Sequence, residues 1–354
     1  MPPSSPPRGR SDFKVAIICA LPVEAEYVES AFDKCWDDEG KRYGKAAGDK
    51  NSYTTGVIGE HNVVLVHMPN MGSVSASAVA ANVASSFPSI QLGLVVGICG
   101  VVPIHPKTKQ DIMLGDVVIS TAVVQYDFGR QYPRGFKRKK AIEDSLGRAN
   151  REIRAVAAKL DTHQNQRRLK KQLRHHLSQL QSQVPGAKYP GAAQDHLYEA
   201  SYLHSHRQGT GSCEKCQDTL GACSSTCDEL GCEKDKLVLR KLPKSAESLS
   251  MDAEENHEPS VYLGRFGSGN SVMKSSTHRD QIAKDDNITA FEMEGAGVWD
   301  ELPTVMIKGA CDYADSHKSK EWQRFAAATA AACMKAFLKE WVTSDQTSQD
   351  LQQG

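Results

Sequence analysis

The segment Phe291-Glu292-Met293-Glu294-Gly295, with the apolar run from Thr304 to Lys308 and the acidic residue Asp312 after it, indicates an α/β fold. The glycine opens a helix with little side-chain bulk, and the following run is β-branched, as in a strand. That strand delivers Asp312 to its carboxyl end, where α/β sheets present their ligands. Acidic groups from both segments therefore share one cleft in this interpretation. The alternative is a solvated helix N-terminus whose glutamates complement the helix dipole.

Two further buried strands precede this segment in the chain. Val15 to Cys19 and Gly93 to Val96 are continuous apolar runs, which are typical of strands covered on both faces. A proline ends the first run and places Glu24 at its carboxyl end. Gly97 follows the second run and lets the chain pass close to a ligand, although a plain turn is the alternative there.

Shorter patterns complete the predicted order of elements. They indicate a hairpin from Tyr53–Ile58 and Val63–His67, a helix capped by Ser73 that runs to about Ser86, one or two strands in Asp116–Val124, a helix from Ala141 to Leu160 with an amphipathic continuation through Leu180, a strand beginning at Val261, a helix near His278–Lys284 and a closing helix in Lys320–Trp341. Helices alternating with buried strands predict an α/β fold around one sheet.

Together these segments resemble the purine nucleoside phosphorylase and uridine phosphorylase superfamily, which also includes the 5′-methylthioadenosine/S-adenosylhomocysteine nucleosidases. The resemblance rests on the opening segment and on three others: the stretch from Val15 to Glu26, the glycine-rich Leu94 to Gly100, and Ser268-Gly-Asn270. It covers about residues 13–128 and 261–342. Two more segments, 125–130 and 311–318, are similar to fungal nucleoside-phosphorylase-like domains that often stand at the head of immune-receptor-type proteins.

The resemblance implies a three-layer α/β/α fold with a central mixed sheet. We expect one such domain over residues 13–342, interrupted by a long irregular insertion at 141–259 that departs from the family pattern. The Pro-, Ser- and Arg-rich residues 1–12 are expected to form a disordered leader, and the polar residues 343–354 a disordered tail. Acidic residues 245–258 are expected to be mobile.

Composition narrows the classes of partner. Lys and Arg together number 43, as do Asp and Glu, so no global basic field favours nucleic acid or an anionic membrane. No apolar run approaches the ~20 residues of a membrane helix, and the first ten residues lack the apolar core of a signal peptide. We therefore expect a cytoplasmic protein with neither a nucleic-acid nor a membrane partner.

The predicted insertion contains five cysteines: Cys213, Cys216, Cys223, Cys227 and Cys232. A CxxC pair with more cysteines downstream can hold a structural zinc ion, which a reducing cytosol favours over disulfides. The spacing fits no standard zinc finger. We therefore expect free thiols in an irregular loop and no metal, with structural zinc as the alternative.

By the same resemblance, the carboxylates divide the work of breaking an N-glycosidic bond. Such a reaction needs a proton or hydrogen bond for the departing base and charge stabilisation for the sugar. Asp312 would meet the purine N7 and exocyclic edge, Glu294 would hold the ribose hydroxyls, and Met293 would lie against the sugar. Glu292 would fix the turn or the ribose, and Gly97, Ile98 and Asn270 would line the site.

The nucleophile is predicted from the phosphate-binding side chains that this chain lacks. Phosphorylases of this family hold phosphate with an arginine after the first strand and with an arginine and a serine around the glycine turn, and the matching positions here are Glu24, Val95 and Ile98. An anionic Glu24 would repel phosphate. In the nucleosidases a glutamate at this position deprotonates water, and a supporting arginine corresponds to Lys308 here.

The substrate side departs from the nucleosidases as well. Val272 replaces their base-lining aromatic residue, so Tyr126 or Phe128 would stack on the base. Basic residues, Arg130 and Lys274 above all, suit a 5′-phosphate better than a thioether, although surface solvation is the alternative for each.

We therefore expect a purine N-ribosyl hydrolase for adenosine or its 5′-phosphates AMP and ATP, without a cofactor, and by resemblance a homo-oligomer. Two alternatives stay open. One is a phosphate-dependent purine nucleoside phosphorylase. The other is a module that senses nucleosides without turnover.

Overall fold

The computed structural model describes residues 6–205, 226–240 and 258–344. It contains a nine-stranded mixed sheet in the order β10-β9-β6-β11-β5-β1-β4-β3-β2. The strands span Val15–Cys19 (β1), Lys34–Cys35 (β2), Ser52–Ile58 (β3), His61–His67 (β4), Leu92–Val101 (β5), Val117–Gln125 (β6), Val261–Ser268 (β9), Ile288–Glu292 (β10) and Thr304–Asp312 (β11). β10 also pairs with β5, so this end of the sheet closes on itself.

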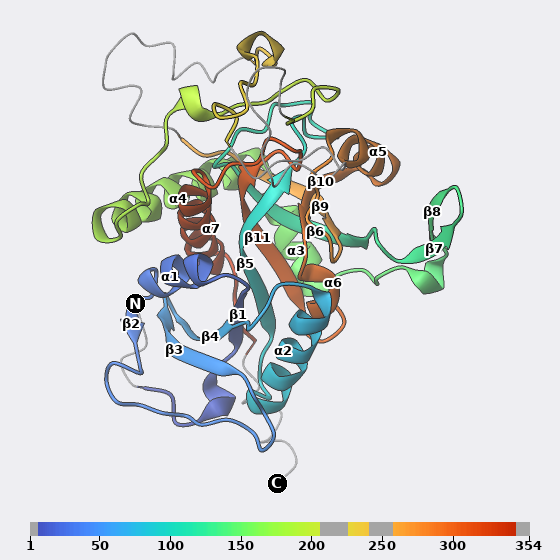
Figure 1. The fold of residues 1–354 in the computed structure, drawn as a ribbon. Helices are drawn as coiled ribbons and strands as arrows, with labels where there is room; N and C mark the ends of the chain where they lie inside the picture. Colours follow the sequence, from blue (N-terminus) through green and yellow to red (C-terminus); the bar gives the residue numbers. More distant parts are fainter. Residues whose placement is uncertain (1–5, 206–225, 241–257, 345–354) are drawn as a thin grey trace.

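The helices lie on both sides of the sheet (Figure 1). They span Pro22–Ser30 (α1), Ser73–Ser86 (α2), Arg151–Leu160 (α3), His163–Gln183 (α4), Ser276–Asp286 (α5), Gly295–Val298 (α6) and Gln323–Leu338 (α7). No helix of the described residues is long and apolar enough to cross a membrane.

The strands at the centre are buried because their sequences are apolar throughout. Every residue of β1 is buried, and only Ile98 of β5 and Asp312 of β11 are partly exposed. β1, β5 and β11 run parallel, so their carboxyl ends share one edge of the sheet. Glu24, Ile98 and Asp312 all lie toward that edge, which makes it the natural place for a site.

Glycine and alanine bring the layers into close contact. A Cβ on Gly309 of β11 would lie 2.0 Å from the carbonyl oxygen of Ala326 in the Ala-rich α7. On the opposite face of β11, Met306 lies against Gly295, where a Cβ would lie 2.3 Å from its sulfur. Because alternate residues of a strand face opposite ways, α6 and α7 cover opposite faces of β11. These layers confirm the α/β/α architecture and its mixed sheet.

Most elements predicted from the sequence are present, with four corrections. The helix expected from Ala141 begins only at Arg151, and a short 3-10 turn at Ile142–Asp144 precedes it. Ser73 does not cap α2, because Gly72 occupies the cap position with a φ of +107°. Gly93–Val96 lies in the first half of a longer strand, β5, and residues 126–134, where no strand was predicted, contain part of a hairpin.

That hairpin consists of β7 (Gly129–Tyr132) and β8 (Gly135–Arg138) and stands out from the body of the molecule (Figure 1). The predicted insertion is also partly regular, since its described residues include α3, α4 and three 3-10 turns, Ile142–Asp144, Ala192–Gln194 and Lys234–Lys236. In the predicted leader, Arg10–Asp12 forms a 3-10 turn. The acidic stretch 245–257, the start of the leader and most of the predicted tail lie outside the described residues.

Candidate active site

Glu24 lies in the first turn of α1, immediately after β1. Its carboxylate accepts hydrogen bonds from the backbone N–H groups of Ala20 and Leu21, at 2.9 Å each, and of Ile98, at 2.8 Å. These donors fix the carboxylate between the ends of β1 and β5, and its side chain is almost fully buried. The sequence predicted this position correctly, but it gave no sign that the backbone of β5 holds the carboxylate.

Gly97 leaves the room that Glu24 occupies. A Cβ at Gly97 would lie 1.9 Å from Glu24 Oε1, well inside contact distance. We expect Gly97→Ala to displace the carboxylate and abolish activity with any substrate that the chain turns over. Gly93→Ala is the matched control on the same strand, because its Cβ would meet Leu302 at 3.2 Å. Equal activities of the two variants would show that the position of Glu24 does not matter.

Lys308 joins Glu24 to the opening segment. Its ammonium lies 3.9 Å from Glu24 Oε1 and 3.5 Å from Glu294 Oε2, and the side chain is fully buried. Burial alone would lower the pKa of Lys308, but Glu24 and Glu294 raise it above its usual value. Burial raises the pKa of Glu24, the Lys308 ammonium opposes the rise, and Glu294 adds to it. A charged lysine thus holds Glu24 nearer its ionised form.

The two glutamates of the opening segment have different surroundings. Glu292 Oε2 accepts the backbone N–H groups of Glu294 and Gly295 at 2.8 Å each, so Glu292 fixes the turn into α6. Burial and the neighbouring Glu294 raise its pKa. Glu294 Oε1 accepts only a long hydrogen bond of 3.4 Å from Gly72 N–H. Met293 between them is half-buried.

Two buried polar atoms in this cluster lack a hydrogen-bond partner within the described residues: Lys308 Nζ and Glu292 Oε1. Such atoms are uncommon in native proteins and usually indicate an unaccounted ligand or water. The cluster therefore offers both a donor and an acceptor to a hydroxyl-bearing ligand. It is not the solvated helix N-terminus considered as an alternative, because Glu24, Glu292, Glu294 and Lys308 are all buried.

Asp312 closes β11 at the same sheet edge. Its Oδ1 receives the N–H of Ala314 at 2.8 Å and the ammonium of Lys318 at 2.8 Å, while the thiol of Cys311 donates to Oδ2 at 3.3 Å. Burial lowers the pKa of Lys318, but the carboxylate of Asp312 raises it above its usual value. Gly100 makes room here too, since a Cβ on it would lie 2.7 Å from Asp312 Oδ1. No sequence pattern predicted the contact of Lys318 with Asp312.

Asn270 links three segments beside the cluster. Its Oδ1 accepts the N–H and the hydroxyl of Ser73 at 2.9 Å each, and Asp127 accepts its backbone N–H at 2.7 Å. Asn270 therefore holds the start of α2 near the β6–β9 strand ends. No sequence pattern predicted that Asp127 would bind Asn270.

The aromatic residues near this edge differ in exposure. Tyr126 is buried, donates to the carbonyl of Ser271 at 3.0 Å and meets Phe291 edge-on at 5.8 Å, so it supports the loop. Phe128 is 41% exposed, and the Lys139 ammonium lies 4.9 Å from its ring centre. Val272 is also exposed. Of the two aromatic candidates, Phe128 is the more accessible to a base.

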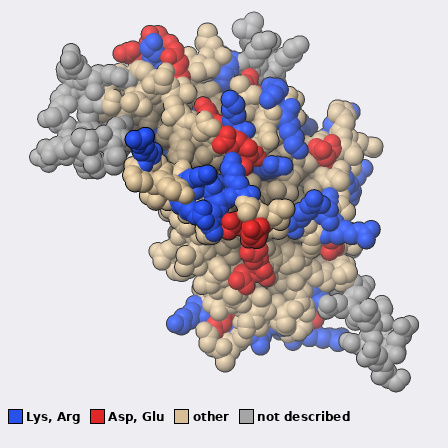
Figure 2. Space-filling model, turned by 90° about the vertical axis from the view of Figure 1, so that its right-hand side faces the viewer, with Lys and Arg blue, Asp and Glu red and all other residues tan. Residues whose placement is uncertain are grey.

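The basic residues Arg130 and Lys274 are exposed and come from separate segments. Arg130 lies on β7 opposite Lys137, and Lys274 precedes α5. Figure 2 looks onto the side of the molecule toward which the hairpin projects, and basic side chains gather there in the middle of the face. The structure does not join these two residues to the carboxylate cluster by any contact.

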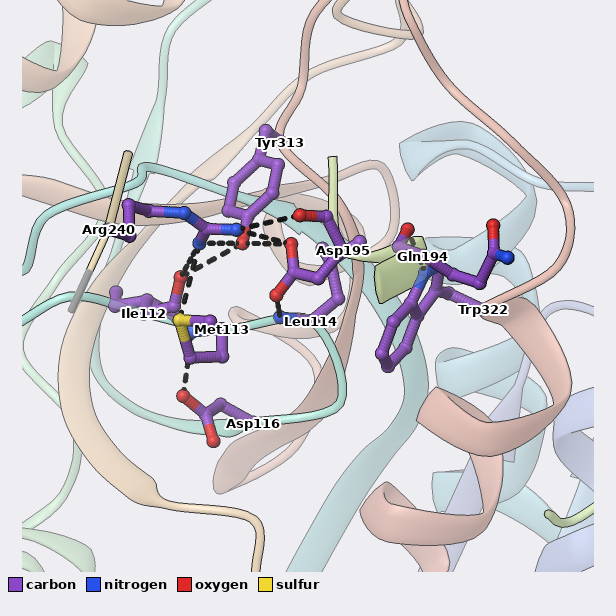
Figure 3. A network of polar contacts seen from close by, with 9 residues as sticks. All are labelled: Ile112, Met113, Leu114, Asp116, Gln194, Asp195, Arg240, Tyr313 and Trp322. Atoms are coloured by element: carbon purple, nitrogen blue, oxygen red, sulfur yellow. Dashed lines mark hydrogen bonds and ion pairs between the residues drawn. The ribbon is translucent and has the colours of Figure 1, made fainter. Parts of the chain in front are cut away.

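A polar network that includes Tyr313, the residue after Asp312, anchors the insertion (Figure 3). Arg240 pairs with Asp195 at 2.6 Å and also donates to the hydroxyl of Tyr313, which in turn donates to Asp195 at 2.7 Å. Leu114 N–H donates to the other oxygen of Asp195 at 3.1 Å. The pair is almost fully buried. Sequence patterns gave no sign of this network, because its members are far apart in the chain.

Comparison with known proteins supports the fold and the family. Residues 14–184 match the family model described as the phosphorylase superfamily. The nucleotide-binding leucine-rich repeat (NLR)-like protein of Hyaloscypha variabilis is 29% identical over 333 residues, which is 92% of this chain and 29% of that protein. The chain thus spans less than a third of that relative's length.

Similar solved structures include a 5′-methylthioadenosine/S-adenosylhomocysteine nucleosidase from Neisseria meningitidis in complex with methylthio-immucillin-A (TM-score 0.52, 15% identity, 93% of this chain and 99% of that one). A futalosine hydrolase from Helicobacter pylori has a TM-score of 0.52 at 14% identity, with 93% and 99% covered. A nucleosidase of the first kind from Colwellia psychrerythraea in complex with adenine has a TM-score of 0.53 at 14% identity, with 94% and 98% covered. At these identities the similarity shows the fold.

Proposed function

We propose that this chain, whose residues 14–184 match the phosphorylase superfamily model, hydrolyses the N-glycosidic bond of purine nucleosides, with water as the nucleophile. The observation that carries the proposal is the buried carboxylate of Glu24, held by three backbone N–H groups between β1 and β5. It occupies the place where, by the family resemblance, a phosphorylase has a phosphate-binding arginine. An anion there repels phosphate but can orient and deprotonate a water molecule.

The rest of the cluster supports this division of work. As the bond to the base breaks, the ribose gains oxocarbenium character, which the carboxylates of Glu24 and Glu294 stabilise electrostatically. Glu294 has spare acceptor capacity for the ribose hydroxyls, since its Oε1 receives only the long bond from Gly72. Lys308 keeps Glu24 in the ionised form that a base requires, and Met293 covers the sugar.

The departing base meets Asp312. Its carboxylate faces the purine N7 and exocyclic edge in this proposal, and the Lys318 ammonium, 2.8 Å from Oδ1, holds a proton at this end of the site. A base that leaves with a proton or a strong hydrogen bond is a better leaving group. Adenine is the preferred base, in line with the adenine bound to the Colwellia nucleosidase.

Chromatography of released base tests the proposal. Adenosine, AMP, ATP, inosine and methylthioadenosine are incubated with the purified chain, with and without added phosphate. We expect adenine from at least one adenosine derivative in phosphate-free buffer. Release that depends strictly on phosphate would favour the phosphorylase alternative, and tight adenosine binding without any release would favour the nucleoside-sensing alternative.

A preference for 5′-phosphorylated adenosine is the finer part of the proposal, supported by the basic side chains that gather, beside acidic ones, in the middle of Figure 2. If Arg130 and Lys274 bind the phosphates, each charge-assisted hydrogen bond contributes ~1.5–3 kcal/mol, or roughly 10- to 100-fold in kcat/KM. Arg130→Ala or Lys274→Ala should lower kcat/KM for AMP or ATP by that factor and leave adenosine nearly unchanged. Equal losses on both substrate types would remove the 5′ preference. A homo-oligomer that completes the site also remains part of the proposal.

The Lys308–Glu24 pair predicts a shift in pH dependence. In Lys308→Met the ammonium that opposes the raised pKa of Glu24 is gone, so burial and Glu294 raise that pKa further. Less Glu24 is then ionised at a given acid pH, and the acidic limb of kcat/KM moves to higher pH. Lys308→Arg, which keeps the charge, should leave the limb near its wild-type position.

Unfolding gives an independent check on the same variant. A carboxyl whose pKa is higher in the folded than in the unfolded state binds more protons when folded, so its folded state loses stability as pH rises. The Tm of Lys308→Met should therefore fall with rising pH more steeply than that of the wild type. An unchanged acidic limb and an unchanged Tm profile would together show that Lys308 does not control the charge of Glu24.

A further inference from the structure

Four side chains outside the carboxylate cluster converge on one point: His204, Cys227, Cys232 and His317. Their ligand atoms all lie within 4.8 Å of one another. They come from three parts of the chain that are distant in sequence. We propose that they bind a structural zinc ion, which fastens the insertion to the loop that follows β11.

The spacing of the ligand atoms fits tetrahedral zinc. Cys227 Sγ lies 3.7 Å from His204 Nδ1 and 3.6 Å from His317 Nδ1, and Cys232 Sγ lies 3.6 and 3.9 Å from the same two nitrogens. Zinc bonds of about 2.3 Å to sulfur and 2.0–2.1 Å to nitrogen place tetrahedral ligand atoms about 3.3–3.8 Å apart. The side chains therefore already stand close to coordinating distance.

The surroundings aim the ligands at a common centre. His317 Nε2–H donates a hydrogen bond to the carbonyl oxygen of Tyr202 at 3.0 Å. In this tautomer Nδ1 carries no proton and can bind the metal. The His317 ring also stacks on Tyr198, with 4.1 Å between ring centres. The N–H of Cys232 donates to the carbonyl of Cys227 at 2.9 Å, which folds the C-x4-C turn and brings both thiols to one side.

The donor set favours zinc in a closed, structural role. Two thiolates and two imidazoles fill a tetrahedral shell, so no position is left for water or substrate. On binding, the zinc ion replaces the two thiol protons, which pass to solvent, and the site becomes neutral. The insertion would then be held to Asp312 from two sides, by the network of Figure 3 and by His317, whose neighbour Lys318 pairs with Asp312.

This ligand set differs from the one considered from the sequence. From the sequence, the five cysteines of the insertion were considered as one group, and free thiols without metal were expected. Cys227 and Cys232, the members of that group that lie in the described residues, join the site, and two histidines from elsewhere complete it. Cys213, Cys216 and Cys223 lie outside the described residues. His204 lies 23 residues before Cys227 and His317 lies 85 residues after Cys232, so cysteine spacing alone missed them.

Metal analysis of the purified full chain tests the proposal. Mass spectrometry of the metal content should find about one zinc ion per chain. The double variant Cys227→Ser/Cys232→Ser should lose it. Cys35→Ser, which changes a half-buried free cysteine elsewhere, should retain it, and so should Cys213→Ser/Cys216→Ser. A chain without zinc, or zinc that survives in the first double variant or is lost in Cys213→Ser/Cys216→Ser, would overturn the assignment.

Cobalt substitution keeps the proposal testable if the serine variants do not fold. The wild-type chain reconstituted with Co²⁺ should show the intense ligand-field bands of a tetrahedral site together with thiolate-to-cobalt charge transfer. His317→Cys should retain the metal and strengthen the charge-transfer band, since a third thiolate replaces an imidazole. Weak octahedral bands without charge transfer would contradict a site made of these side chains.

Discussion

Glu24→Gln is expected to lower kcat for nucleobase release by at least ~10²-fold, as typically follows from removing a general base. The amide keeps the size of the side chain but cannot take a proton from water. With its oxygen in the place of Oε2, the amide can still accept the N–H groups of Ala20 and Leu21 and loses the bond from Ile98, so the fold should survive. Steady-state rates with the best substrate of the panel, alongside circular dichroism, measure both effects.

Glu26→Gln is the matched control for this variant. Glu26 lies on the same helix and carries the same charge, but it is exposed and pairs with Arg324. Its replacement should leave kcat within about twofold, because surface ion pairs contribute little. A near-normal rate in Glu24→Gln would remove Glu24 from the mechanism, and an equal loss in both variants would point to a general effect of charge on α1.

Asp312→Asn is expected to have the second largest effect, again at least ~10²-fold on purine substrates. The amide loses the ion pair with Lys318, so the proton-holding pair at the base is gone. The N–H of Ala314 can still bond to the amide oxygen, which preserves the turn. Rates with the substrate that the wild type turns over best give the measurement.

The leaving group distinguishes the two roles. The nitrophenolate of a nitrophenyl riboside departs without needing a proton, so Asp312→Asn should hydrolyse this substrate at a rate near that of the wild type. Glu24→Gln should remain slow on the same compound, since it still lacks a base for water. If Asp312→Asn is equally impaired on both kinds of substrate, Asp312 supports the structure of the loop and does not assist the departing base.

The fold was predictable because its central strands are unambiguous. Val15–Cys19 matches β1 residue for residue, and the run from Thr304 continues to Asp312 as β11. A strand buried on both faces must be apolar throughout, and this signal is strong in a single sequence. The start of α3 was missed, because helix formers extend before Arg151, whereas the side chain of Asn150 caps the helix there by accepting the N–H of Ile153 at 2.8 Å.

The site was predictable as a set of residues but not as a geometry. Glu24, Glu292, Glu294 and Lys308 meet as expected, because the ends of parallel strands share an edge. What the sequence could not show is which atoms face one another. The contact of Lys318 with Asp312 depends on how the two side chains pack. Gly97 leaves space for the carboxylate of Glu24, which lies more than 70 residues away in the sequence.

The central claim is that water, and not phosphate, attacks the anomeric carbon. The most direct measurement is the identity of the sugar product when the chain acts on its best nucleoside in phosphate buffer, followed by phosphorus NMR and by a reducing-sugar assay. We predict that free ribose, or its 5′-phosphate from AMP, forms in equal amount with the base, and that no ribose 1-phosphate signal appears. A ribose 1-phosphate signal that grows with the released base would contradict the account.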